Sequence, residues 1–82
     1  MPPLKEKLLA RLRPILAETL GADEDEITLE TNVYDDLNAD VIEFHDEVIP
    51  LIEEEFGVAI DDADVPDLTT VGELVQYLAE NV

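Results

Sequence analysis

The side chains that could perform chemistry in this chain are almost all carboxylates. The 82 residues include 22 Asp and Glu, a single histidine and no cysteine. Two carboxylates could form a general acid–base pair, but no spacing singles out such a pair. His45 has no evident triad or metal partner, so we expect it to be structural or exposed. Because aromatic residues are few and a glycine-rich phosphate loop is absent, the chain is not expected to be an enzyme.

Three neighbouring aspartates raise the question of a calcium site: Asp61, Asp62 and Asp64. An EF-hand loop needs a glycine at its sixth position and a glutamate at its twelfth. A loop counted from the first of these aspartates has Pro66 and Gly72 there, and a loop begun at Asp23 fails as well. No specific metal site is predicted. Weak binding of divalent cations, and with it the class of acidic cation-binding modules, stays open.

The charges are unevenly distributed along the chain. All four cations lie in the first 13 residues, and the remainder holds 21 of the 22 acids, for a net charge of −18. Such a chain repels nucleic acid and anionic lipid, so the expected partners are basic surfaces of other proteins. The length predicts one domain, residues 1–82. No signal-peptide pattern or apolar run of about 18 residues occurs, so a cytoplasmic monomer without membrane contact is expected.

Periodic leucines predict a first helix that starts at Pro2 and Pro3 and stops at Gly21, a typical residue just past a helix end. Pro14 inside it predicts a kink or a local break near Arg13. An acidic connection follows over residues 22–37. Its apolar residues are expected to anchor it in the core: Ile27, Leu29, Val33, Tyr34 and Leu37.

A second helix is predicted over residues 40–56, capped by Asp40 with Glu43 three residues later, and ended by Gly57. Pro50 predicts a second kink. The stripe expected to face the core is Val41, Phe44, Val48, Ile52 and Phe56, flanked by Ile49.

The rest of the chain predicts a short helix and a final longer one. Residues 61–65 form at most two turns, ended by Pro66. Thr69 or Thr70 then caps the last helix, and Thr70 with Glu73 fits a capping box. Three longer helices, one short helix and no strand pattern predict an all-α fold, a small four-helix bundle.

Three segments together resemble the acyl carrier proteins: residues 36–40, 52–58 and 68–73. The family's second helix opens with Asp-Leu-Gly-x-Asp-Ser-Leu/Ile, and 4′-phosphopantetheine is joined to the serine. By this resemblance Val41 matches the serine and is not competent, with Asp40 and Ile42 on either side. The chain contains no serine, so no cofactor is expected in this form. Asn38 replaces the family's glycine and is expected to substitute for it, because asparagine tolerates a left-handed backbone.

The second helix is one residue longer than is usual in the family, counted from Asp40 to Phe56. If the extra residue comes early, the serine position falls on Ile42 instead, which also lacks a hydroxyl. An insertion turns every later residue of a regular helix by about 100°. The face that the family offers to partner enzymes could therefore lose its register.

Two readings stay open for Val41 and Ile42. They could cap the core between helices. Alternatively, they could form an exposed apolar spot for a partner, or mark a deliberate loss of the modification. The resemblance implies that an acidic face of the second helix docks on basic surfaces of fatty-acid or polyketide-type enzymes, although any acidic helix presents a solvated face. This face comprises Glu43, Asp46, Glu47, Glu53 and Glu54. The alternative is a genuine acyl carrier whose serine is missing in this variant.

Overall fold

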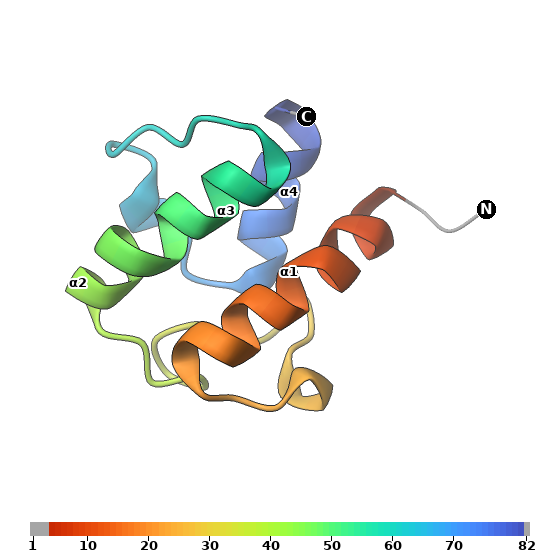
Figure 1. Cartoon of the computed structure of the whole chain (residues 1–82), viewed down its shortest axis with the longest axis vertical. Coiled ribbons are helices and arrows are strands. Elements are labelled where there is room, and N and C mark those ends of the chain that lie inside the picture. Colours follow the sequence, from red (N-terminus) through yellow and green to blue (C-terminus); the bar gives the residue numbers. More distant parts are fainter. Residues whose placement is uncertain (1–3, 82) are drawn as a thin grey trace.

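The computed structural model describes residues 4–81, which form a small bundle of helices. The longer elements are α1 (Leu4–Leu20), a second helix composed of α2 (Val41–Glu43), the π segment η2 (Phe44–Val48) and α3 (Ile49–Phe56), and finally α4 (Val71–Asn81). Short 3₁₀ turns are η1 (Glu24–Glu26) and η3 (Val65–Asp67). Within residues 4–81 there is no strand, only a single bridge between Asn32 and Thr70. The prediction of an all-α bundle is confirmed (Figure 1).

Helix α1 presents four leucines to the core and ends where the sequence predicts. Gly21 has φ +68°, and the N–H of Ala22 donates to the carbonyl of Ala17 at 3.1 Å, which is a Schellman stop. Of the kink or local break predicted near Arg13, the break is absent, because the helix continues through Pro14. Pro14 has no N–H to donate to the carbonyl of Ala10. Both residues are exposed, so water can hydrogen-bond to this carbonyl instead. The expected start at Pro2 and Pro3 lies outside the described residues.

The connection after α1 is anchored by most of the predicted residues: Ile27, Val33 and Leu37 are buried, and Tyr34 is half-buried. The ring of Tyr34 meets that of Phe44 edge-on, with centroids 5.6 Å apart. Leu29 was expected in the core, but its side chain is 39% exposed. Here the backbone makes the contact, since the Leu29 carbonyl accepts from the N–H of Gly72 at 2.8 Å. A Cβ on that glycine would lie 2.7 Å from this oxygen, so α4 approaches closely only because it carries glycine there.

The second helix contains one wide turn. The N–H of Ile49 donates to the carbonyl of Phe44, five residues back, which is the π pattern rather than the α pattern. The buried residues of this helix are Phe44, Val48, Ile49, Ile52 and Phe56, so Ile49, five positions after Phe44, faces the core beside Val48. The π turn thus takes up one extra residue, and the later residues still face the core instead of being turned away from it.

Pro50 lies directly after this wide turn, at the start of α3. Proline lacks an N–H, and in a regular α-helix its ring collides with the carbonyl four residues back. The π segment widens the helix at this point and relaxes both problems. The kink expected at Pro50 therefore takes the form of a π turn within one continuous helix (Figure 1).

The end of α3 is where the sequence predicts it, whereas the short helix that follows is not. Gly57 ends α3 with φ +66°, as expected. The short helix predicted over residues 61–65 is instead the 3₁₀ turn Val65–Asp67, and Pro66 lies inside it rather than ending it. Proline fits there because the first turn of a helix needs few N–H donors.

The capping box of α4 is present. The Glu73 carboxylate accepts from the N–H of Thr70 at 3.0 Å, and the Thr70 hydroxyl accepts from the N–H of Glu73 at 3.1 Å. Further hydrogen bonds from Thr69 and Thr70 lower the pKa of Glu73, the side-chain bond from Thr69 being the largest cause.

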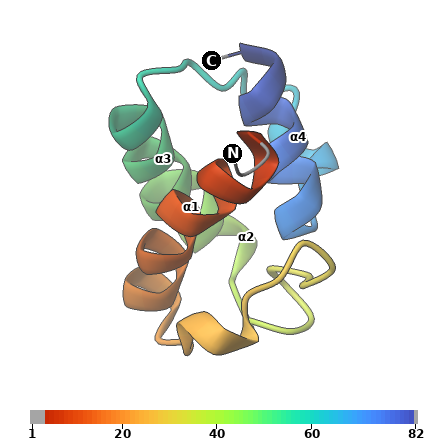
Figure 2. The same cartoon turned by 90° about the vertical axis from the view of Figure 1, so that its right-hand side faces the viewer.

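Helix α1 packs beside α4 (Figure 2). One arginine, Arg11, connects α1 to α3. The Arg11 guanidinium donates to the carbonyl of Glu55 at 2.7 Å and lies 4.5 Å from the ring centroid of Phe56. A cation at a helix C-terminus is favourable, because unpaired carbonyls collect there. Within residues 4–81, no helix is both long enough and apolar enough to cross a membrane.

Candidate binding site at the start of the second helix

Asp40 begins the second helix as the sequence predicts. Its backbone is extended, with φ −84° and ψ 146°, and its carboxylate accepts from the N–H of Ile42 at 2.8 Å. The reciprocal bond of a capping box, from Asp40 N–H to Glu43, is not among the hydrogen bonds found for residues 4–81. Asn38, two residues earlier, has φ +58°, which confirms that it adopts the left-handed conformation usually left to glycine.

The two apolar residues after the cap point into solvent. Val41 is 66% exposed and Ile42 is 70% exposed, so the expectation that Val41 belongs to the core stripe is wrong. The reading in which both residues cap the core is wrong as well. The first residue of this helix to enter the core is Phe44, which leaves the preceding turn outside. The two neighbouring branched residues therefore form an exposed apolar spot at the start of the helix.

These residues line a cleft that three separate parts of the chain build. We call it the His45 cleft; its volume is about 420 Å³. Its walls are Tyr34, Val41, Ile42, His45, Asp46, Asp62, Val65 and Pro66. In Figure 1 the turn at residues 65–67 lies beside the α2 end of the second helix. Both segments contribute lining residues to the cleft.

His45 bridges two carboxylates at the rim of this cleft. Its Nδ1 lies 3.2 Å from Asp46 Oδ1, and its Nε2 lies 3.1 Å from Asp62 Oδ1. The hydrogen bond with Asp46, followed by the hydrogen bond and charge of Asp62, raises the pKa of His45 above its ordinary value. His45 is half-exposed, which agrees with the expected surface position. No sequence signal predicted that Asp62 would pair with His45. The two residues are 17 positions apart, and only the return of the chain past α3 brings them together.

The five acids predicted to form one face do not all lie together. Asp46 faces the His45 cleft, whereas Glu54 lines a different hollow with Ile15 of α1. The carboxylate of Glu53 is half-buried and accepts from the N–H of Ile60 at 2.7 Å, so it holds the chain after α3 in place. Glu47 is exposed and Glu43 is half-buried.

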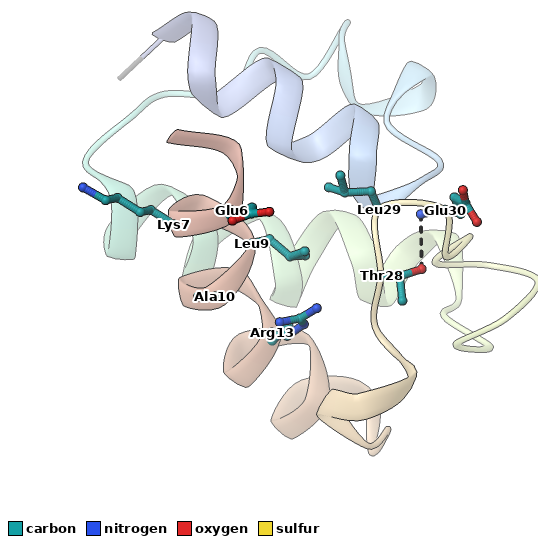
Figure 3. A pocket seen from close by; sticks show the side chains of 8 residues that line it. All are labelled: Glu6, Lys7, Leu9, Ala10, Arg13, Thr28, Leu29 and Glu30. Atoms are coloured by element: carbon teal, nitrogen blue, oxygen red, sulfur yellow. Dashed lines mark hydrogen bonds between the residues drawn. The ribbon is translucent and has the colours of Figure 1, made fainter. Parts of the chain in front are cut away.

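A second hollow, of about 730 Å³, lies between α1 and the connection (Figure 3). Its charged lining residues are two cations and two anions: Lys7, Arg13, Glu6 and Glu30. Arg13 reaches toward the connection and donates to the carbonyl of Ile27 at 2.9 Å, while Lys7 extends away from it (Figure 3). The charges balance and the guanidinium is already bound, so no ligand class is indicated. Among the described residues, no three His, Cys, Asp or Glu side chains are placed to hold a metal ion.

The described residues thus form a helical bundle with an aspartate-capped second helix and a long first connection, and the match that follows places this chain in the class of phosphopantetheine-attachment domains. The family model described as "Phosphopantetheine attachment site" matches residues 10–78. The chain is 38% identical over 78 residues to an acyl carrier protein of Thermotoga maritima, covering 95% of each chain. It is 42% identical over 74 residues to one of Exiguobacterium sp., covering 90% of this chain and 92% of the relative.

A solved acyl carrier protein from Enterococcus faecalis has the same fold. The TM-score is 0.80 and the identity 34%, over 98% of this chain and 100% of that chain. The chain therefore belongs to the acyl carrier protein family. The family uses 4′-phosphopantetheine as its prosthetic group, and its members are carriers without catalytic activity, so the chain is not an enzyme.

Proposed function

We propose that this chain is an acyl-carrier-like protein that does not carry 4′-phosphopantetheine in this form, and that it acts by docking on partner enzymes. The observation that carries the proposal is the exposed Val41 directly after the cap Asp40. In the family's Asp-Ser order this is the attachment position. A valine side chain holds no oxygen that could form the phosphate ester, so the residues present do not fit the covalent group.

The position of the π segment supports Val41 over Ile42 as the attachment position. The extra residue of the second helix is taken up between Phe44 and Val48, downstream of both candidates. The order of Asp40, Val41 and Ile42 therefore matches Asp-Ser-Leu/Ile without a shift.

No nearby hydroxyl is a good substitute for the missing serine. The Thr31 hydroxyl donates to the carbonyl of Glu26 at 2.9 Å, and the Thr69 hydroxyl donates to the Glu73 carboxylate at 2.8 Å. Both hydroxyls belong to the packing of the connection and of α4, and both residues lie outside the motif of Asp40, Val41 and Ile42.

Docking on basic surfaces of fatty-acid or polyketide-type enzymes is supported by the charge of −18 and by the exposed acids near the cleft. Long-range attraction of this kind speeds the encounter and selects basic partners. Asp46 and Glu47 are the acids we assign to the contact, since both are exposed on the π segment. Glu53 contributes to docking only indirectly: its carboxylate accepts from the N–H of Ile60 and so holds the chain after α3 in place.

One second candidate is favoured by a specific observation. The cap at Asp40 and the solvent exposure of residue 41 leave the attachment position accessible to a modifying enzyme. A genuine acyl carrier whose serine has been replaced in this variant would have the same geometry.

Intact-mass measurement after incubation with a broad-specificity phosphopantetheinyl transferase and coenzyme A tests these proposals. The unaltered chain should gain nothing, Val41→Ser should gain one phosphopantetheine group, and Ile42→Ser should gain none. Modification of the unaltered chain would refute the lost attachment. Modification of Ile42→Ser alone would show that the register argued from the π segment is wrong.

Docking is tested separately by binding to a panel of purified fatty-acid synthesis enzymes. Glu47→Lys should weaken binding, and Glu24→Lys, an identical charge change in the exposed turn η1, should weaken it much less. Equal effects of both substitutions would reduce the proposal to a general effect of net charge.

A further inference from the structure

His45 contacts two carboxylates that belong to different parts of the chain. Asp46, its neighbour on the second helix, has its Oδ1 3.2 Å from Nδ1, whereas Asp62, which follows α3, has its Oδ1 3.1 Å from Nε2. Among the hydrogen bonds found for residues 4–81, the contact with Asp62 is the only one between residues 41–48 and residues 61–67. It therefore links two walls of the His45 cleft that are otherwise not hydrogen-bonded to each other.

Both contacts are hydrogen bonds at the same time only when the histidine is protonated. An ionised carboxylate only accepts, and a neutral imidazole has one N–H and one nitrogen without a proton. Neutral His45 can thus donate to Asp46 or to Asp62, and the other carboxylate then faces a lone pair. The imidazolium donates from both nitrogens, so the observed bridge fits the charged ring. The hydrogen bond with Asp46 is accordingly the largest of the causes that raise the pKa of His45.

The segment that the histidine holds is short, and we call residues 61–64 the strap. Both of its ends are anchored. Just before it, the N–H of Ile60 donates to the Glu53 carboxylate at 2.7 Å. At its far end, the Tyr77 hydroxyl of α4 donates to the Asp64 carboxylate at 3.1 Å. Movement of the strap is therefore confined to its middle.

The middle of the strap is held to the second helix by His45 alone. Asp62 and Ala63 are exposed, so core packing does not fix them. The other hydrogen bonds are local: the N–H groups of Ala63 and Asp64 donate to the carboxylate and to the carbonyl of Asp61, each at 2.9 Å. Local turns of this kind move with the strap. Breaking the contact between His45 and Asp62 therefore frees the middle of the strap from the second helix.

Among the described residues that line the His45 cleft, only His45 can carry a positive charge. The other titratable lining residues are Asp46 of the second helix, Asp62 of the strap and Tyr34 of the connection, and neither α1 nor α4 contributes a lining residue. Burial raises the pKa of Tyr34, so this residue stays uncharged. The proton on His45 is thus the one positive charge that joins the two carboxylates, and without it they face an uncharged ring.

From this geometry we propose that the proton on His45 controls the strap. Protonated His45 holds Asp62 against the second helix, and loss of the proton releases the middle of the strap and widens the His45 cleft. This switch needs neither a partner nor a prosthetic group, so it goes beyond the proposed function. The cleft is closed at pH values below the titration midpoint of His45 and open above it.

The test measures amide hydrogen exchange and ¹⁵N relaxation of the full chain by NMR, on both sides of the midpoint that the His45 ring signals report. His45→Ala is the reference, because residue 45 is far from the strap in sequence and leaves the intrinsic exchange rates of Ala63 and Asp64 unchanged. Below the midpoint these two amides should exchange about two- to fivefold more slowly in the parent than in His45→Ala, the range expected for an exposed charged pair. Above the midpoint the two proteins should agree. The charge of the imidazolium by itself would attract hydroxide and speed exchange, so it does not explain slower exchange.

Three further variants separate the hydrogen bond from net charge. Asp62→Ala removes the acceptor, so the strap should be released at every pH. Asp67→Ala removes the same charge from a nearby exposed residue and should behave as the parent does. Asp46→Ala leaves the single N–H of the neutral ring free for Asp62, so above the parent's midpoint its strap should exchange more slowly than the parent's.

Contrary results are equally distinct. Equal exchange in the parent and in Asp62→Ala below the midpoint would overturn the proposal, because the strap would then be held by something else. Equal effects of Asp62→Ala and Asp67→Ala would reduce it to the net charge of the chain. Loosening of the connection, residues 22–37, together with the strap above the midpoint would replace it with a general loosening of the fold. If Asp46→Ala releases its strap as the parent does, one proton shared between two carboxylates is not the control.

Discussion

Deleting Glu47 tests whether the π segment stores the extra residue of the second helix. Glu47 is exposed within this segment, so its own side chain contributes little to the core. Without it, the core residues Phe44, Val48, Ile49, Ile52 and Phe56 would be spaced by three, one, three and four positions. These spacings fit one face of an α-helix. All five should remain buried.

The expected cost comes from Pro50. Once the wide turn closes into an α-helix, the proline ring meets the carbonyl four residues back, which costs about 3 kcal/mol. A change of 1 kcal/mol moves the melting temperature of a domain of this size by about 4–8 °C. The deletion alone should therefore lower Tm by roughly 12–24 °C, and the deletion combined with Pro50→Ala should recover most of the loss.

Urea and thermal unfolding followed by circular dichroism measure both variants. A deletion of Leu51, which lies in α3 outside the π segment, is the matched control. It should be more destabilising than the Glu47 deletion with Pro50→Ala. If the π turn is kept, Ile52 and Phe56 turn out of the core, and if the turn closes, Ile49 does, and each such loss costs about 2–5 kcal/mol. If the Glu47 deletion with Pro50→Ala also fails to fold, the π segment does not accommodate the extra residue. The assignment of Val41 to the attachment position then loses its support.

Three further predictions concern contacts elsewhere in the molecule. Arg11→Ala should lower the free energy of unfolding by about 1–2 kcal/mol, since it removes a charged hydrogen bond to the Glu55 carbonyl and a cation–π contact. Arg11→Lys keeps the charge and should lower the free energy of unfolding by less. Urea unfolding in which both variants match the parent would contradict this. Gly72→Ala should destabilise the chain by about 1 kcal/mol, because a clash of about 1–3 kcal/mol outweighs a helix-propensity gain of about 1 kcal/mol; an unchanged urea midpoint would show that the connection yields freely. NMR titration should find the pKa of His45 above its ordinary value and lowered by Asp62→Asn. Since the folded pKa is the higher one, this interaction stabilises the fold fully below the unfolded pKa and is lost as pH rises through the folded pKa; an unshifted titration would refute it.

Local signals in the sequence predicted most of the helix ends correctly. Gly21 and Gly57 end helices with positive φ, and Asp40 and Thr70 begin them with side-chain caps. Asn38 takes the left-handed conformation expected of it. Each of these features depends on hydrogen bonds or steric limits within a few residues, so neighbouring residues are enough to predict them.

The errors arose where burial depends on distant parts of the chain. Leu29 and Val41 fit apolar patterns but lie in solvent. The Leu29 segment docks on α4 through its carbonyl, and the helix start leaves Val41 outside the core. The path of the helix through Pro14 was also missed, because a proline on an exposed side leaves its unpaired carbonyl to water. Periodicity identifies apolar positions but not what covers them.

By itself the sequence determined the helical class, the family and the acidic character of this protein, because composition, helical spacing and short caps are properties of adjacent residues. By its resemblance to the family it also indicated a second helix one residue longer than usual. Only the tertiary structure decided where that residue goes, since the choice of a π turn depends on keeping Ile49, Ile52 and Phe56 in a shared core. The same holds for the His45 cleft, whose pairing of His45 with Asp62 exists only once the chain folds back past α3.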